Sequence, residues 1–132
     1  MKTKYIFFSI IVILAVIIGG YYAYSSYYQG PHIKSINPAN NEKNVTISKV
    51  VRINFTEPIL AGSNFDNITI SKVNGEAVNT NKSINGSILT IRNNGNYAKG
   101  ATYSIRIPEN SVKDQTGNPL ENTKVYYFTI TT

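Results

Sequence analysis

A single long apolar run, from Tyr5 to Tyr24, limits more strongly than any other feature what this chain can form. Ser9 is the one interruption between Ile6 and Ile18, and no charged residue lies anywhere in the run. A helix rises about 1.5 Å per residue, so about 20 residues span roughly 30 Å, the thickness of a bilayer's hydrocarbon core. Residues 1–24 are therefore predicted to form an N-terminal transmembrane helix that leaves the rest of the chain on one side of a membrane.

The residues around this run predict its orientation. Lys2 and Lys4 precede it without any acidic residue, so by the positive-inside rule the N-terminus is cytoplasmic and the C-terminal domain extracellular. The far end is rich in tyrosine, which suits the outer headgroup layer. The alternative is a cleaved signal peptide, for which Ala23 and Ser25 form a weak cleavage motif. The length of the run and its bulky tyrosines favour an uncleaved signal-anchor and a single-pass protein of the cell membrane.

The charge distribution and the cysteine content exclude some classes of function and of stabilisation. From His32 to the C-terminus, 11 Lys and Arg and 7 Asp and Glu give a net charge of +4, because two of the 13 basic residues precede the apolar run. These charges are interspersed, whereas a nucleic-acid binder concentrates them on one element, so no nucleic-acid partner is expected. The chain has no Cys, so an exported domain must be held by its apolar core alone. His32 is the only histidine, and it lies beside Pro31 in the expected linker.

Alternating apolar and polar residues predict β-strands after residue 32. We expect a juxtamembrane linker over residues 25–32 and one β-domain over residues 33–132. The expected strands are 33–36, 50–55, 67–72, 88–92, 102–107 and 124–131, with a short further strand at 77–78. Segments 40–44, 79–86 and 112–120 are expected to be loops. About seven short antiparallel strands favour a β-sandwich over a small barrel.

Several segments occur in the order found in a known family. Segments 35–41 and 50–59 resemble the opening of bacterial Ig-like domains of the S-layer-protein type, and the most specific pair is 55–59 (Phe-Thr-Glu-Pro-Ile) with 113–120 (Lys-Asp-Gln-Thr-Gly-Asn-Pro-Leu). Segments 89–91, 100–105 and 128–131 are similar to the family's later motifs. The resemblance implies an Ig-like β-sandwich on a prokaryotic cell surface, serving as a spacer, an adhesion module or an S-layer building block without enzymatic activity. Tyr103, three residues after Gly100, resembles the tyrosine of a tyrosine corner, whose hydroxyl bonds nearby backbone.

The most repeated chemical motif is the Asn-x-Ser/Thr sequon, which marks candidate N-glycosylation sites in an exported chain. The five candidates are Asn44, Asn54, Asn67, Asn81 and Asn85. Three of them fall in expected loops, and Asn54 falls in the middle of a strand. We therefore expect a glycoprotein, with the loop sequons better placed than Asn54.

A weak calcium candidate lies in segment 112–120. Asp114 and Asn118, with Glu57 or Asp66 from elsewhere, could supply oxygen ligands, of which Ca²⁺ needs six to eight. The alternative is turn chemistry, in which Asp and Asn bond their own backbone. We favour the turn and expect no metal and no other cofactor. A copper carrier of similar fold would need several His and Met ligands, and this chain has only His32 and the initiator Met1.

These observations favour a membrane-anchored, surface-exposed, non-catalytic Ig-like module with a structural, adhesive or cell-envelope assembly role. The expected partners are the membrane, through Tyr5 to Tyr24, and cell-envelope proteins or glycans. The alternative is an exported binding module for carbohydrate or another small ligand, in which Tyr97 or Tyr127 stacks on a sugar. For these two tyrosines we favour packing at a sheet margin. We expect no enzyme, because the sequence contains no recognisable nucleophile and base.

Overall fold

The structure of the protein is a computed structural model that describes residues 29–132. The expected membrane anchor over residues 1–24, and most of the expected linker over residues 25–32, lie outside the described residues. Within the described part of the chain, no helix is long and apolar enough to cross a membrane.

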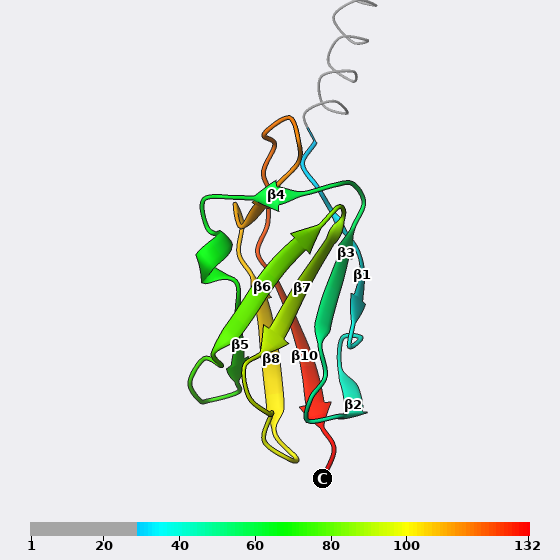
Figure 1. The fold of residues 1–132 in the computed structure, drawn as a ribbon, viewed down its shortest axis with the longest axis vertical. Helices are drawn as coiled ribbons and strands as arrows, with labels where there is room; N and C mark the ends of the chain where they lie inside the picture. Colours follow the sequence, from blue (N-terminus) through cyan, green and yellow to red (C-terminus); the bar gives the residue numbers. More distant parts are fainter. Residues whose placement is uncertain (1–28) are drawn as a thin grey trace, which may run out of the picture.

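Residues 29–132 form an all-β sandwich of ten strands and one short 3-10 helix (Figure 1). The elements in chain order are β1 (Ile33–Asn37), β2 (Glu42–Val45), β3 (Val51–Phe55), β4 (Leu60–Ala61), η1 (Phe65–Asn67), β5 (Thr69–Lys72), β6 (Thr80–Asn85), β7 (Ile88–Asn93), β8 (Thr102–Ile107), β9 (Val112–Lys113) and β10 (Lys124–Ile130). The expected β-sandwich is thus confirmed, with more strands than the seven expected from the sequence.

Two four-stranded sheets form the sandwich, and a two-stranded ribbon lies at one end (Figure 1). One sheet has the order β1-β3-β7-β6, the other β2-β10-β8-β5, and β4 pairs with β9. The chain enters the sandwich at the end of the β4–β9 ribbon and its C-terminus lies at the opposite end (Figure 1).

The core lies between the inner faces of the two sheets, as the alternation predicts. Val51, Ile53 and Phe55 of β3 are all buried, and Arg52 between them is exposed. The same alternation buries Leu89 and Ile91 on β7. Seventeen buried hydrophobic residues make one contiguous core, so the domain has its own hydrocarbon interior and needs no disulfide.

Three segments expected to be loops contain strands. Segment 40–44 overlaps β2, segment 79–86 contains β6, and segment 112–120 begins with β9. The prediction of an entirely antiparallel sandwich was also wrong, since β2 pairs with β10 in parallel. These strands escaped the sequence pattern because β2 and β6 carry few apolar residues and β9 has two residues only. In the reverse sense, segment 77–78 forms only an isolated bridge, between Ala77 and Ser71.

The expected tyrosine corner is present. The hydroxyl of Tyr103 accepts a hydrogen bond at 2.8 Å from the backbone N–H of Ala98, which lies five residues earlier in the sequence. Gly100 has φ +73 between them, a conformation that L side chains rarely adopt. The ring of Tyr103 stacks on Phe128 and meets Tyr97 edge-on. The corner therefore joins the loop before β8 to the aromatic part of the core.

The last residues of the expected linker are built into the domain. Gly30 and Pro31 are buried, and a Cβ placed on Gly30 would lie 2.0 Å from the backbone oxygen of Pro119. The N–H of His32 donates to the Thr56 hydroxyl at 3.1 Å, and the N–H of Thr56 donates to the carbonyl of His32. The folded part of the chain therefore begins before Ile33.

Candidate functional site on the outer face of the β1–β3–β7–β6 sheet

The outer face of the β1-β3-β7-β6 sheet is almost entirely polar, and strand register sets the rows of its side chains. Arg52 lies opposite Asn37 on one side and Thr90 on the other, and Thr90 lies opposite Ser83. On β7, Arg92 lies two residues beyond Thr90, opposite Asn81. We call this surface the polar sheet face; its residues are Ser35, Asn37, Arg52, Asn54, Asn81, Ser83, Asn85, Ile88, Thr90 and Arg92.

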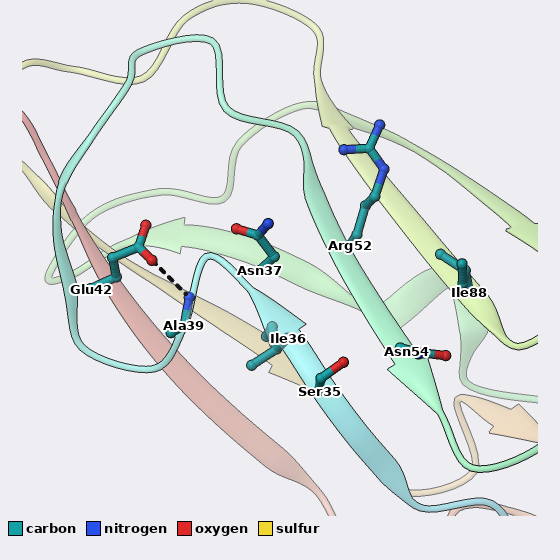
Figure 2. Close-up of a pocket in the computed structure, with 8 residues that line it drawn as sticks. All are labelled: Ser35, Ile36, Asn37, Ala39, Glu42, Arg52, Asn54 and Ile88. Carbon is teal, nitrogen blue, oxygen red and sulfur yellow. Dashed lines mark hydrogen bonds between the residues drawn. The ribbon is translucent and has the colours of Figure 1, made fainter.

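A hollow of about 400 Å³ lies at the β1 side of this face. Figure 2 shows its lining, in which Glu42 and Ile88 lie at opposite ends and Arg52 rises from β3. The carboxylate of Glu42 accepts a hydrogen bond from the N–H of Ala39 at 3.4 Å. The remaining lining residues are Ser35, Ile36, Asn37 and Asn54, so amides and a hydroxyl supply most of its hydrogen-bonding groups. The hollow therefore presents amide, hydroxyl and charged groups beside the apolar side chains of Ile36 and Ile88.

Carboxylates are absent from all four strands of this sheet, while Lys34, Arg52, Lys82 and Arg92 lie on them. Lys82 points inward, where its Nζ donates to the carbonyl of Ile68 at 3.2 Å and lies over the ring of Phe65. Arg52 and Arg92 are exposed. The outer face thus combines two guanidinium groups with neutral amides and hydroxyls.

The calcium candidates Asp114 and Asn118 come together in a tight turn after β9. Oδ1 of Asp114 accepts from the N–H and hydroxyl of Thr116 and from the N–H of Asn118, and Oδ2 accepts from the Asn118 side-chain amide. Burial acts to raise the pKa of Asp114, but the bonds from Asn118 and Thr116 outweigh it and hold that pKa below its usual value. The geometry agrees with the turn alternative.

Among residues 29–132, no group of three or more His, Cys, Asp or Glu could hold a metal ion. Asp66 lies on η1 and is not part of the Asp114 turn. The weak calcium candidate at Asp114 and Asn118 has a simple test: EDTA should leave the melting temperature unchanged if the turn is complete without metal. A lower melting temperature in EDTA that calcium restores would contradict the turn alternative.

Glu57 is the acidic residue that meets Asp114. Its Oε1 is buried without a hydrogen-bond partner in the described part of the chain. Burial raises the pKa of Glu57, the neighbouring Asp114 carboxylate raises it further, and His32 acts in the opposite direction. The two motifs that carry the family resemblance therefore meet at the end of the domain where the chain enters, and this contact strengthens as Glu57 takes up a proton.

The five sequons differ in how free their amides are. The Asn54 oxygen accepts a bond from Ser87 and the residue is half-buried, so it is the least accessible. Asn67 and Asn81 are exposed but their amides donate to Asn64 and Asn94. The two others, Asn44 with φ +57 on β2 and Asn85 at the end of β6, are exposed. Asn81 and Asn85 were expected in a loop and lie instead on β6, on the polar sheet face. Glycosylation stays a prediction.

The tyrosines proposed for sugar stacking have different environments. Tyr97 is 3% exposed, lies edge-on to Tyr103 and Phe128 in the core, and its pKa is raised by burial to about 12, so it cannot stack on a ligand. Tyr127 on β10 is 43% exposed on the outer face of the other sheet. The sequence pattern does not indicate the polar sheet face, because it predicts a loop over the whole of β6. The available signal is the run of Asn and Ser at every second position of 81–85.

Comparison with known proteins supports the same architecture. A family model described as bacterial Ig-like domain matches residues 28–132, while no curated protein matches the sequence. Among solved structures, the N-terminal part of the bacterial S-layer protein SbsC is similar over 83% of this chain, with 18% identity and a TM-score of 0.58. This chain spans about a quarter of that structure, since the match covers 25% of it.

Two further solved structures share the fold over most of their length. CopC from Methylosinus trichosporium OB3b is 16% identical with a TM-score of 0.58, over 76% of this chain and 93% of that chain. PcoC, a methionine-rich copper resistance protein from Escherichia coli, is 16% identical with a TM-score of 0.59, over 77% of this chain and 99% of that chain. At these identities the likeness shows the fold alone.

Proposed function

Because the chain belongs to the bacterial Ig-like domain family, whose members are usually non-catalytic, we propose that it is a membrane-anchored, surface-exposed module with a structural, adhesive or cell-envelope assembly role. The family resemblance read from the sequence is confirmed by the match over residues 28–132. The anchoring and the role are our proposal, and they combine this fold with the apolar run that precedes it.

One observation carries the proposal: the domain begins at Gly30, six residues after the apolar run ends at Tyr24. Gly30 lies against Pro119, and the backbone of His32 is bonded to Thr56. An anchored run would thus hold the sandwich close to the lipid surface by its β4–β9 end. The C-terminus would then lie at the end of the domain farthest from the membrane (Figure 1). This geometry supports a module that presents its sheet faces and distal loops to the cell envelope.

Single-cysteine labelling tests this topology, because the chain has no Cys of its own. A Gln115→Cys variant places a thiol on the exposed turn after β9, and a Thr3→Cys variant places one before the apolar run. A membrane-impermeant maleimide should label Gln115→Cys in intact cells and Thr3→Cys only after lysis. The opposite pattern would contradict the proposed orientation.

The state of the N-terminus needs a separate measurement. The membrane fraction, washed with alkaline carbonate, should retain the protein with an intact mass that includes residues 1–24. A soluble product that begins near Ser26 would show a cleaved signal peptide and would remove the anchor from the proposal, although it would leave export in place.

A second function, an exported binding module for carbohydrate or another small ligand, is favoured by the polar sheet face and its hollow. The amides and hydroxyls of that face can both donate to and accept from sugar hydroxyls. Tyr127 on the opposite sheet offers an exposed aromatic ring for stacking. Substitution at each surface separately would show which of them binds.

A further inference from the structure

We propose that the polar sheet face binds an anionic polysaccharide, a chain of sugars that bears carboxylates. The inference deepens the second function above and rests on export for its biological setting. The binding itself is a property of the domain surface and can be measured without any knowledge of topology.

The first step of the argument is the pairing of two arginines. Arg52 on β3 lies directly opposite Thr90 on β7, and Arg92 lies two residues further along β7 on the same face. Residues in this diagonal relation lie about 7–8 Å apart at Cα, well within the reach of two long guanidinium side chains. Both arginines are exposed, so a chain that lies across β3 and β7 can meet both of them.

The second step is charge complementarity. No Asp or Glu lies on β1, β3, β6 or β7, and Glu42 of β2 lines the same hollow as Arg52, at its β1 end. Arg52 and Arg92 therefore have no acidic neighbour within their own sheet. Guanidinium groups bind carboxylates through paired N–H donors, which gives geometric selectivity as well as attraction.

The third step selects a sugar chain over other anionic partners. Around the arginines, Thr90, Ser83 and Asn81 present hydroxyl and amide groups that match the mixed donors and acceptors of sugar hydroxyls. A nucleic acid would favour aromatic platforms for its bases, and this face has none. A lipid surface would favour a larger apolar area than the single exposed Ile88.

The outer face of the other sheet serves as an internal comparison. Arg106 of β8 is exposed on that face, and exposed Val125 and Tyr127 lie on the neighbouring strand β10. Ser104 lies in the middle of β8, opposite Tyr127, as Thr90 lies in the middle of β7 opposite Arg52. The same substitution at Ser104 and at Thr90 therefore adds one carboxylate to each face and separates a local effect from a change in net charge.

The experiment measures binding of the full chain, in a non-ionic detergent, to polygalacturonate, with neutral dextran and single-stranded DNA as comparison polymers. Intact mass is measured first, because a glycan at Asn81 or Asn85 would cover the face. We expect polygalacturonate binding that weakens as salt is raised from about 0.05 to 0.5 M, and little binding to dextran. Arg52→Gln with Arg92→Gln should weaken binding by about tenfold, the product of two exposed ion pairs.

The matched single variants make the test sharper. Thr90→Glu places a carboxylate between the two arginines and should weaken binding by about tenfold, as the loss of both arginines does. Ser104→Glu should bind within about twofold of the wild type, since charges on the far face are screened. Thermal melts followed by circular dichroism identify any variant that fails to fold. If Thr90→Glu fails to fold, the double variant Arg52→Gln with Arg92→Gln provides the test.

Four outcomes would overturn the proposal. Equal loss in Thr90→Glu and Ser104→Glu would show attraction by net charge only. Loss in Tyr127→Ala with retention in the arginine variant would place the site on the other sheet. Equal binding to dextran would remove the anionic requirement, and tighter binding to DNA would favour a nucleic acid. If the maleimide labels Gln115→Cys only after lysis, the result contradicts export but leaves the measured polysaccharide binding unchanged. Failure of the proposed topology and failure of the proposed binding can therefore be distinguished.

Discussion

At the scale of single residues, polar contacts at both ends of the sandwich secure its loops. Tyr103 fixes the loop before β8 through one hydroxyl, and Asp114 fixes the turn after β9 through four accepted bonds. Glu57 is different, because its carboxyl is placed against that of Asp114 and one of its oxygens is buried without a partner. The first two groups stabilise the fold, and the third costs stability when it is ionised.

The tyrosine corner gives a prediction with a close control. Tyr103→Phe keeps the ring against Phe128 and removes the hydroxyl that accepts from Ala98. We expect a loss of about 1 kcal/mol in the free energy of unfolding, the usual net value of one such bond. Urea denaturation should show this loss, whereas Tyr127→Phe, at an exposed ring, should stay within about 0.5 kcal/mol of wild type. Equal values for the two variants would contradict a structural role for the corner.

The pKa of Glu57 predicts a pH dependence of stability. Because its folded pKa is raised above the ordinary 4.5, the folded state binds this proton more tightly, and stability is lost as pH rises from about 4.5 through the folded pKa. Glu57→Gln should therefore match wild type near pH 4 and melt about 2 °C higher at pH 7. Thermal melts over this range measure the effect. Glu76→Gln, in an exposed turn, should show no such divergence; a higher wild-type Tm at pH 7 would reverse the sign and contradict the argument.

At the scale of elements, the end of the domain where the chain enters is assembled from segments far apart in sequence. β4 pairs with β9, and Leu120 N–H donates to the carbonyl of Val112 to close the Asp114 turn onto that ribbon. Gly30 then lies on Pro119, so the incoming chain is held against the same turn. Because Gly30 has no side chain, its backbone can lie against the backbone of Pro119, and the chain is packed into the domain from this residue onward.

Substitution of Gly30 tests this contact. A methyl group on Gly30 would overlap the carbonyl of Pro119, so one of the two segments must move. We expect Gly30→Ala to lower the free energy of unfolding by about 1–3 kcal/mol, as overpacking does elsewhere. Gly95→Ala is the matched control, since its Cβ would meet only the side chain of Asn93 at 3.8 Å, and it should be nearly neutral. Equal, small effects in denaturant titrations would show that the incoming chain is not held at Pro119.

At the scale of the whole molecule, one continuous core carries the stability. Without Cys, the sandwich depends on its seventeen buried hydrophobic residues, of which Phe55 and Phe128 are among the largest fully buried side chains. Phe128 lies on β10 at the centre of its sheet, stacked on Tyr103 and edge-on to Tyr97. The apolar interior is therefore the main contact between the two sheets.

Removal of one central ring should consequently approach the stability limit of the domain. Phe128→Ala is expected to cost about 3–5 kcal/mol, a large part of the 5–15 kcal/mol typical of a single domain. Thermal denaturation followed by circular dichroism measures the loss. Tyr127→Ala, the next residue on the opposite face, should cost less than about 1 kcal/mol. A small effect of Phe128→Ala would mean that contacts outside the core hold the sheets together.

The sequence alone predicted the parts of this protein that depend on local pattern. Alternation of apolar residues located β3, β5, β7, β8 and β10, because each of these strands buries one face and exposes the other. The motifs around Glu57 and Asp114 led to the right family, and the apolar run from Tyr5 to Tyr24 carries the proposal of an anchor. Each of these is a property that neighbouring residues possess without reference to the rest of the chain.

Only the tertiary structure decided what depends on partners distant in sequence. β2 forms because β10 runs beside it in parallel, and β6 forms because a tight hairpin lays it along β7, although its inward Lys82 breaks the apolar pattern. Tyr97 is buried in the core against Tyr103 and Phe128, which its own neighbours in sequence do not indicate. The polar sheet face is likewise a product of register across four strands. Strand pairing determines which side chains become neighbours. The free energy of pairing depends on both strands, so the sequence of one strand alone does not determine its partner.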